Sequence, residues 1–255
     1  MDYTGYISER IKLYIFDLDG TLVDSLFDLS DAVNGILGRY GLPSVPSDIV
    51  RQGIGIGSRN LLFRCFAWSA KQSGRDCPVR IAETGIRNDS DPLTSNERGA
   101  AYPGFDAVIT DGLKEYHELY MQRCTQKTAF YPGIEKWLAH LAGRGVRMAV
   151  LSNKPETATV KILRSLNTVH LFDVIAGPES TGVLKPDPAG IVQIIKKTGI
   201  LPAETAMIGD STVDIETGRN AGVLVCGITG GYGDDKALRE SGCEVLIERS
   251  LGGIR

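Results

Sequence analysis

The sequence predicts an α/β protein: a doubly wound, Rossmann-like parallel sheet core with a small helical domain inserted into it. Three observations carry this prediction. A short apolar run at residues 12–16 is cut off by turn-forming residues 17–20, which is typical of a central strand buried on both faces. A block with helical periodicity follows. After residue 133, predicted strands and helices alternate to the end, as in a parallel sheet with helical crossovers.

Helical periodicity begins after Ser25, where apolar residues recur at intervals of three and four: Leu26, Leu29, Val33, Ile36 and Leu37. The segment Gly41-Leu42-Pro43 ends this helix, because glycine and proline are common just beyond a helix C-terminus. A second helix is predicted over residues 57–68. Residues 69–101 are polar, rich in turn formers and weakly periodic, so we expect a long loop or a partly ordered insertion there.

Helical periodicity resumes at residues 108–124, and the alternating part of the chain follows. The predicted strands are residues 147–151, 174–176, 206–208, 223–227 and 245–247. The predicted helices between and after them are residues 135–143, 156–166, 188–198, 213–221 and 234–241. We therefore expect a discontinuous α/β core of residues 1–23 and 132–255, and a helical domain of residues 24–131 with a polar insertion near 69–101.

The amino-acid composition argues against several classes of protein. The 255 residues are 42% hydrophobic, and 28 basic against 31 acidic residues give a net charge of −3, so neither disorder nor a basic nucleic-acid footprint is expected. No apolar run reaches the roughly 18 residues of a membrane helix, and residues 1–12 lack an apolar signal core, so we expect a cytoplasmic protein. Five widely spaced cysteines predict free thiols rather than disulfides or a zinc site.

Acidic residues follow two of the predicted strands. Asp17 and Asp19 come after the first strand, and Asp210 and Asp214 come after residues 206–208. Ligands of an open parallel sheet bind beyond the carboxyl ends of its strands, so these carboxylates should converge. Clustered carboxylates repel one another unless a cation holds them, and Mg²⁺ prefers a few carboxylates together with water and phosphate oxygens.

Groups suited to a phosphate accompany these acids. Ser152, Asn153 and Lys154 follow the strand at 147–151, and Lys185 precedes a predicted helix. Gly20 would let backbone amides approach an anion closely. Turn-forming residues such as Asp, Asn and Gly also occur after strands for purely structural reasons. That explanation could account for any one of these positions, but it is weak as an explanation for all of them together.

Four segments, in this order, resemble the motifs of haloacid dehalogenase superfamily phosphatases. They are DLDGTLVDS at residues 17–25, LSNK at 151–154, LKP at 184–186 and GDSTVD at 209–214. The helical block after the first motif corresponds to the family's inserted cap domain. Residues 25–66 are more narrowly similar to phosphoglycolate phosphatases, including GLP at 41–43 and IGIG at 54–57. The polar stretch 69–101 is longer than this resemblance would suggest.

The resemblance implies a role for each motif residue. Asp17 would be the nucleophile that takes the phosphoryl group, and Asp19 the general acid and base. Thr21, Ser152, Asn153 and Lys185 would hold the phosphoryl oxygens, and Lys185 would also offset charge beside Asp17. Mg²⁺ would be bound by Asp17, by Asp19 through its backbone carbonyl, and by Asp210. Asp214 would either reach the ion through water or orient the lysine.

The implied activity is Mg²⁺-dependent hydrolysis of a small phosphomonoester, with 2-phosphoglycolate as the expected substrate. The alternatives are another small phosphate (a sugar phosphate, a nucleotide or pyrophosphate), a phosphosugar mutase, or a non-catalytic phosphate-binding module. We expect no nucleic-acid or membrane partner, and a monomer or homodimer. Arg51 and Arg59 flank a glycine-rich segment and could reach a substrate carboxylate, although both also suit solvent-facing positions.

Overall fold

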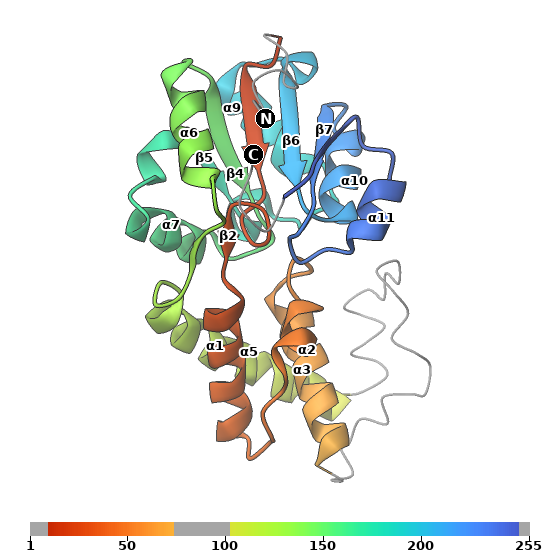
Figure 1. Ribbon diagram of the computed structural model, residues 1–255. Coiled ribbons are helices and arrows are strands. Elements are labelled where there is room, and N and C mark those ends of the chain that lie inside the picture. Colours follow the sequence, from red (N-terminus) through yellow and green to blue (C-terminus); the bar gives the residue numbers. More distant parts are fainter. Residues whose placement is uncertain (1–9, 74–102, 250–255) are drawn as a thin grey trace.

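The computed structural model describes residues 10–73 and 103–249 of the chain (Figure 1). Its core is a parallel six-stranded sheet in the order β5-β4-β1-β6-β7-β8, which confirms the predicted fold class. The strands are β5 (Val174–Ala176), β4 (Arg147–Leu151), β1 (Leu13–Phe16), β6 (Thr205–Gly209), β7 (Leu224–Ile228) and β8 (Val245–Ile247). The first strand of the chain therefore lies in the middle of the sheet.

The two faces of the sheet are covered by different helices. Along β1, Tyr14 and Phe16 belong to the hydrophobic cluster that includes α6 (Ile134–Gly143) and α7 (Glu156–Ser165). Leu13 and Ile15 belong instead to the cluster that includes α9 (Ala189–Thr198). Side chains alternate between faces along a strand, so β1 is buried on both. The remaining helices of this part are α8 (Pro178–Thr181), α10 (Thr212–Asn220) and α11 (Asp235–Glu240), with short 3₁₀ turns at Val169–Leu171 and Pro202–Glu204.

A separate group of helices lies below the sheet in Figure 1. It consists of α1 (Leu26–Arg39), α2 (Ser47–Arg51), α3 (Ser58–Gln72) and α5 (Pro103–Arg123). Their apolar faces pack on one another, with Leu37, Leu62, Phe66 and Tyr116 fully buried or nearly so. The chain enters this group through β2 (Val23–Asp24) and leaves it through β3 (Ala129–Phe130), which pair antiparallel.

One expectation needs correction in this region. The expected loop begins too early, because α3 continues through Ser69 and Ala70, whose buried side chains extend its packed face, and ends at Gln72. The short helix α2 and the β2–β3 pair were not anticipated. The rest of the expected polar insertion, residues 74–101, lies outside the described residues, as does Cys77.

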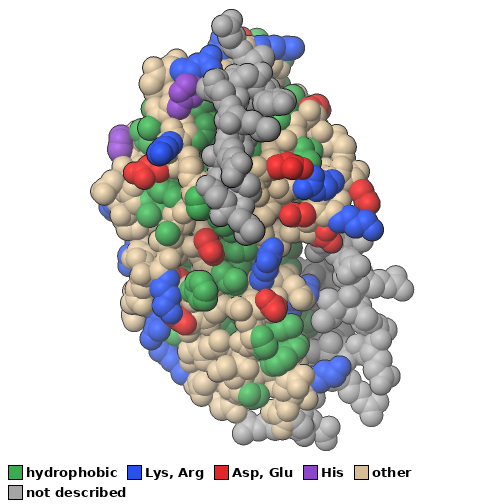
Figure 2. Space-filling view, in the orientation of Figure 1, with side chains coloured by type: hydrophobic (Ala, Val, Ile, Leu, Met, Phe, Trp, Pro, Cys, Tyr) green, Lys and Arg blue, Asp and Glu red, His purple; other side chains and the backbone are tan. Residues whose placement is uncertain are grey.

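The cysteines, the helices and the surface charge of the described residues can also be characterised. Cys65, Cys124, Cys226 and Cys243 are free thiols, and the first three are buried. No helix within residues 10–73 and 103–249 has the length and apolarity needed to cross a membrane. On the face in Figure 2, basic and acidic side chains are interspersed rather than gathered into a patch of one sign.

Candidate active site

The strands bring the predicted site residues to one edge of the sheet. Asp17 follows the last residue of β1, Ser152 follows β4, and Asp210 follows β6. These three strands are neighbours in the order β4-β1-β6, so their carboxyl ends meet. The backbone N–H of Asp17 donates to the Ile208 carbonyl oxygen over 2.9 Å, which continues the β1–β6 pairing up to the site.

Lys185 connects two of the buried carboxylates. Its Nζ lies 2.7 Å from Asp17 Oδ1 and 2.5 Å from Asp214 Oδ1. Burial disfavours the ammonium form, but the charges of Asp17 and Asp214 outweigh burial and raise the pKa of Lys185 above its ordinary value. Lys185 is therefore a fixed cation beside Asp17.

One lysine does not balance the acids around it. Carboxylate oxygens of Asp17, Asp210 and Asp214 lie within 4.8 Å of one another, and all three residues are buried. Burial raises the pKa of Asp17 to about 7; Lys185 opposes this rise, and the charges of Asp214 and Asp210 add to it. Burial, together with the charge of Asp214, also raises the pKa of Asp210. A divalent cation fits here, because it would offset this excess negative charge with the oxygen ligands that hard cations prefer.

Asp210 is held in place by hydrogen bonds from two separate loops. Its Oδ1 accepts a hydrogen bond from Thr21 Oγ1 at 2.9 Å, and its Oδ2 accepts from the backbone N–H groups of Tyr232 and Gly233 at 2.7 and 3.0 Å. Gly20 adopts a φ of +90°, and a methyl group there would overlap the Asp210 carboxylate. Glycine at this position thus satisfies both the turn and the close approach of Asp210.

Asp214 owes its position to the start of α10. Ser211 is the N-cap residue of this helix, and its backbone N–H and hydroxyl donate to Asp214 Oδ2 at 3.1 and 2.6 Å. The other oxygen, Oδ1, faces Lys185. A helix cap therefore aims one carboxylate oxygen at the site.

The residues expected to hold phosphoryl oxygens lie in different environments. Ser152 lines a small cavity beside Asp17. The Asn153 amide instead accepts from Lys185 N–H at 2.7 Å and donates to the carbonyl oxygens of Lys185 and Gly55 at 3.1 and 2.8 Å. Thr21 is 0% exposed, and its hydroxyl donates to Asp210. The side chains of Asn153 and Thr21 thus hold other site residues in place.

Asp19 is also buried, two residues after Asp17, but its carboxylate contacts different partners. Ser25 Oγ donates to Asp19 Oδ1 at 2.5 Å, and Lys154 Nζ lies 2.6 Å from Oδ2. The Asp19 carboxylate is not one of the three carboxylates, those of Asp17, Asp210 and Asp214, that lie within 4.8 Å of one another. Lys154 was recognised in the sequence as part of a strand-end motif without a role of its own.

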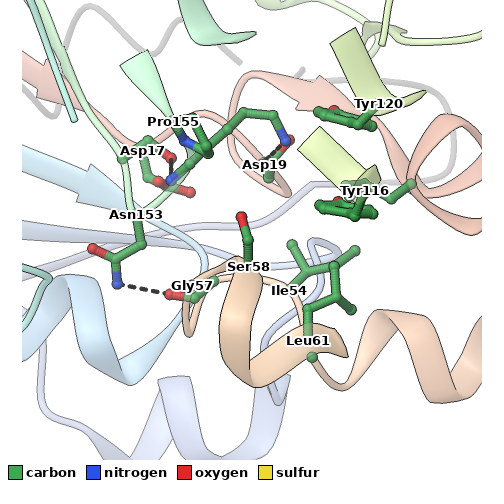
Figure 3. A pocket seen from close by; sticks show the side chains of 15 residues that line it. Asp17, Asp19, Ile54, Gly57, Ser58, Leu61, Tyr116, Tyr120, Asn153 and Pro155 are labelled. Atoms are coloured by element: carbon green, nitrogen blue, oxygen red, sulfur yellow. Dashed lines mark hydrogen bonds and ion pairs between the residues drawn. The ribbon is translucent and has the colours of Figure 1, made fainter. Parts of the chain in front are cut away.

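The small cavity, about 30 Å³, lies between the sheet edge and the helical group (Figure 3). Asp17, Asp19 and Lys154 line its sheet side. Tyr116 and Tyr120 of α5 also line it, with rings stacked at a centroid distance of 5.7 Å. Both tyrosines are buried, and nothing in their helical spacing along the sequence indicates that they face a cavity. A larger hollow of about 590 Å³ adjoins it, sharing residues such as Gly57 and Ser58.

Three arginines complete the surroundings. Arg51 Nη2 donates to the Gly231 carbonyl oxygen at 2.5 Å, and Arg59 Nη1 donates to Thr110 Oγ1 at 3.2 Å. Neither arginine lines the small cavity, although Arg59 lines the larger hollow. Arg249 donates to the carbonyl oxygens of Gly20 and Thr21 at 2.9 and 2.6 Å. No local sequence pattern indicates that Arg249 supports the loop at residues 20–21, because more than 200 residues separate Arg249 from that loop.

The chain is similar to known proteins in both sequence and structure. The family model for haloacid dehalogenase-like hydrolases matches residues 14–228. A Haemophilus influenzae protein named phosphoglycolate phosphatase is 32% identical over 235 residues, 92% of this chain and 93% of that protein. Pseudomonas aeruginosa phosphoglycolate phosphatase 1 is 32% identical, covering 93% of this chain and 76% of that protein. A crystal structure described as a predicted phosphoglycolate phosphatase from Haemophilus somnus is similar with a TM-score of 0.78, at 28% identity and covering 95% and 96% of the two chains.

Proposed function

The chain belongs to the haloacid dehalogenase-like hydrolase family, and we propose that it is a Mg²⁺-dependent phosphatase that hydrolyses 2-phosphoglycolate to glycolate and phosphate. The observation that carries this proposal is the buried Asp17 carboxylate at the end of the central strand, held 2.7 Å from Lys185 Nζ. A carboxylate beside a fixed cation is suited to attack an anionic phosphoryl group. The names of the relatives support the choice of substrate.

Asp17 is the nucleophile in this proposal. One of its oxygens bonds to phosphorus while the bond from phosphorus to the leaving oxygen breaks, and the proton of Asp19 goes to that oxygen. Asp19 then takes a proton from water, which attacks phosphorus and breaks its bond to Asp17. This second step releases phosphate and restores both carboxyl groups. The adjacency of both acids at one cavity supports this division of roles.

Asp17 and Asp210 would hold Mg²⁺ together with the backbone carbonyl of Asp19. The ion would supply positive charge to the phosphoryl oxygens and to the carboxylates around it. The 2.5 Å contact of Asp214 with Lys185 supports the alternative in which Asp214 orients the lysine. Ser152 and Lys185 would hold phosphoryl oxygens directly. The contacts of Asn153 and Thr21 support a positioning role for both.

We also infer that residues 24–131 form a cap domain over a core of residues 1–23 and 132–255. The antiparallel pair β2–β3 supports this division, because it joins the outgoing and returning chain at one point. The site lies between the two parts, with Gly55 of the helical part hydrogen-bonded to Asn153 of the sheet part. Substrate would then be enclosed by both.

The test is hydrolysis by the purified protein of a panel of small phosphomonoesters, with and without Mg²⁺. We expect release of phosphate from 2-phosphoglycolate that stops with a chelator and returns with Mg²⁺. Asp17→Asn should abolish turnover while the circular dichroism spectrum stays unchanged, because the amide is nearly isosteric but a poor nucleophile. Residual turnover above about a hundredth of wild type would reject Asp17 as the nucleophile.

A further inference from the structure

Lys154 is a buried cation whose hydrogen-bonding capacity is only partly used. Its side chain is 4% exposed, and its Nζ lies 2.6 Å from Asp19 Oδ2 and 4.8 Å from the centre of the Tyr120 ring. An ammonium group has three N–H donors. Among the described residues, Asp19 is the one hydrogen-bond acceptor of this ammonium. Since buried polar groups are normally satisfied, the remaining donors point to an anion that joins Asp19 when a ligand is bound.

The position of Lys154 limits what that anion can be. Lys185 faces the carboxylates of Asp17 and Asp214, whereas Lys154 lies beyond Asp19, the proposed proton donor to the leaving group. Lys154 is also the one Lys or Arg that lines the small cavity among residues 10–73 and 103–249. The charge of Lys154 is therefore available on the side of the cavity where the leaving group would lie, and not on the side of the phosphoryl group.

The opposite wall of the cavity is complementary to the same anion. Ser58, the first residue of α3, points its hydroxyl toward Asp17 and Asp19 in Figure 3. Gly55 and Gly57 line the cavity next to it. The first backbone N–H groups of a helix carry partial positive charge and lack partners within the helix, so this wall favours a negative group facing Lys154.

We propose that Lys154 binds a carboxylate on the leaving group of the substrate, and so selects short phosphomonoesters of a hydroxy acid. This inference rests on the proposed function and names the residue that would give it specificity. Asp17 and Lys154 line the same cavity of about 30 Å³, so a carboxylate that reaches Lys154 must lie close to the phosphoryl group, as in a short ester. A lysine–carboxylate contact in this buried position combines a hydrogen bond with an ion pair, and it is therefore stronger than the hydrogen bond that a neutral oxygen could accept from the same ammonium. Arg51 and Arg59 are the competing cations, and neither lines this cavity.

The experiment compares kcat/KM for 2-phosphoglycolate with kcat/KM for its neutral isostere, 2-phosphoglycolamide. The readout is the ratio of the two values measured on one sample, so the fraction of folded enzyme cancels. We expect wild type to prefer 2-phosphoglycolate, and Lys154→Met to lower the ratio about ten- to a hundredfold. Lys154→Arg, which keeps the positive charge, should retain most of the preference even if both rates fall. Lys196→Met, at an exposed position of α9, is the matched control and should leave the ratio unchanged.

Failure of this inference differs from failure of the proposed function. A wild-type protein that hydrolyses neither ester would overturn the phosphatase proposal itself. Equal hydrolysis of both esters by wild type, or equal losses for both in Lys154→Met, would overturn carboxylate binding by Lys154 and leave phosphatase activity standing. A drop of the ratio in Arg51→Ala or Arg59→Ala, but not in Lys154→Met, would transfer the role to that arginine. If Lys154→Met has no measurable turnover, loss of the preference in Lys154→Arg, with amide hydrolysis retained, counts against the inference.

Discussion

The Asn153 side chain is hydrogen-bonded to both ends of the Lys185 main chain. Its Oδ1 accepts from Lys185 N–H at 2.7 Å, and its Nδ2 donates to the Lys185 carbonyl oxygen at 3.1 Å. This pairing fixes the backbone from which the Lys185 side chain reaches Asp17. It also joins the turn after β4 to the loop before α9, two segments 32 residues apart. Lys185 is thus aimed by a residue that need not contact substrate.

We predict that Asn153→Ala lowers kcat by about ten- to a hundredfold, because loss of both hydrogen bonds frees the Lys185 backbone. Asn34 is a matched control, since its side chain makes the same two-sided contact with the main chain of Val45 in the helical part. Asn34→Ala should lower the melting temperature but leave kcat unchanged. Kinetics and thermal melts of both variants check this. A similar drop in kcat for both variants would show that general loosening, and not the position of Lys185, controls the rate.

The raised pKa of Asp17 predicts a pH-dependent effect on the stability of the metal-free protein. The pKa is about 7 in the fold, against an ordinary value of 3.8, so ionised Asp17 destabilises the fold. This destabilisation is absent below pH 3.8, grows as the pH rises to 7, and is complete above it. Asp17→Asn should therefore raise the melting temperature at pH 8, and by less than half as much at pH 5.

Thermal melts in chelator at both pH values test this prediction. The same substitution at exposed Asp111 of α5 gives the baseline. Excess Mg²⁺ should reduce the stabilising effect of Asp17→Asn at pH 8, because the cation offsets the charge of the native carboxylate. If Asp17→Asn raised the melting temperature more at pH 5 than at pH 8, this result would contradict the raised pKa of Asp17.

The contacts of Asp210 predict a graded loss of metal affinity. Asp210→Ala removes a direct ligand in the proposed site and should greatly raise the Mg²⁺ concentration needed for half-maximal activity. Thr21→Val keeps the shape of the buried side chain but removes the hydroxyl that donates to Asp210, so its effect should have the same direction and be smaller. Mg²⁺ titrations of activity measure both effects. A response of Asp210→Ala equal to that of wild type would remove Asp210 from the metal ligands.

Gly20 allows a comparison of backbone strain with a direct clash. Both Gly20 and Gly145 have positive φ, at +90° and +69°, but a methyl group would overlap Asp210 at Gly20 and meet open space at Gly145. Gly145→Ala should destabilise the protein by about 1 kcal/mol and leave activity unchanged. Gly20→Ala should destabilise it more and also raise the Mg²⁺ requirement. Denaturant melts and Mg²⁺ titrations separate the two effects, and an unchanged Mg²⁺ requirement in Gly20→Ala would argue against the overlap.

Local sequence determined most of the sheet and its helices. The strands at residues 147–151, 174–176 and 245–247 lie where the sequence predicted them, because each is a short apolar run bounded by turn residues. Convergence of Asp17 and Asp210 could also be expected, since both directly follow strands of one parallel sheet. The pair β2–β3 could not, because its two-residue strands pair positions about a hundred residues apart and carry no periodic pattern of their own.

Only the tertiary structure decided which partners the site side chains have. Nothing near Asn153 in the sequence indicates that its amide holds Lys185, or that Lys154 lies between Asp19 and the ring of Tyr120. These contacts join the sheet edge to α5 and to distant loops. A sequence pattern reports which face of a strand or helix is apolar, whereas hydrogen bonds and ion pairs depend on how separate elements pack. The types of the proposed catalytic groups are therefore readable from the sequence, and their pairing follows from the fold.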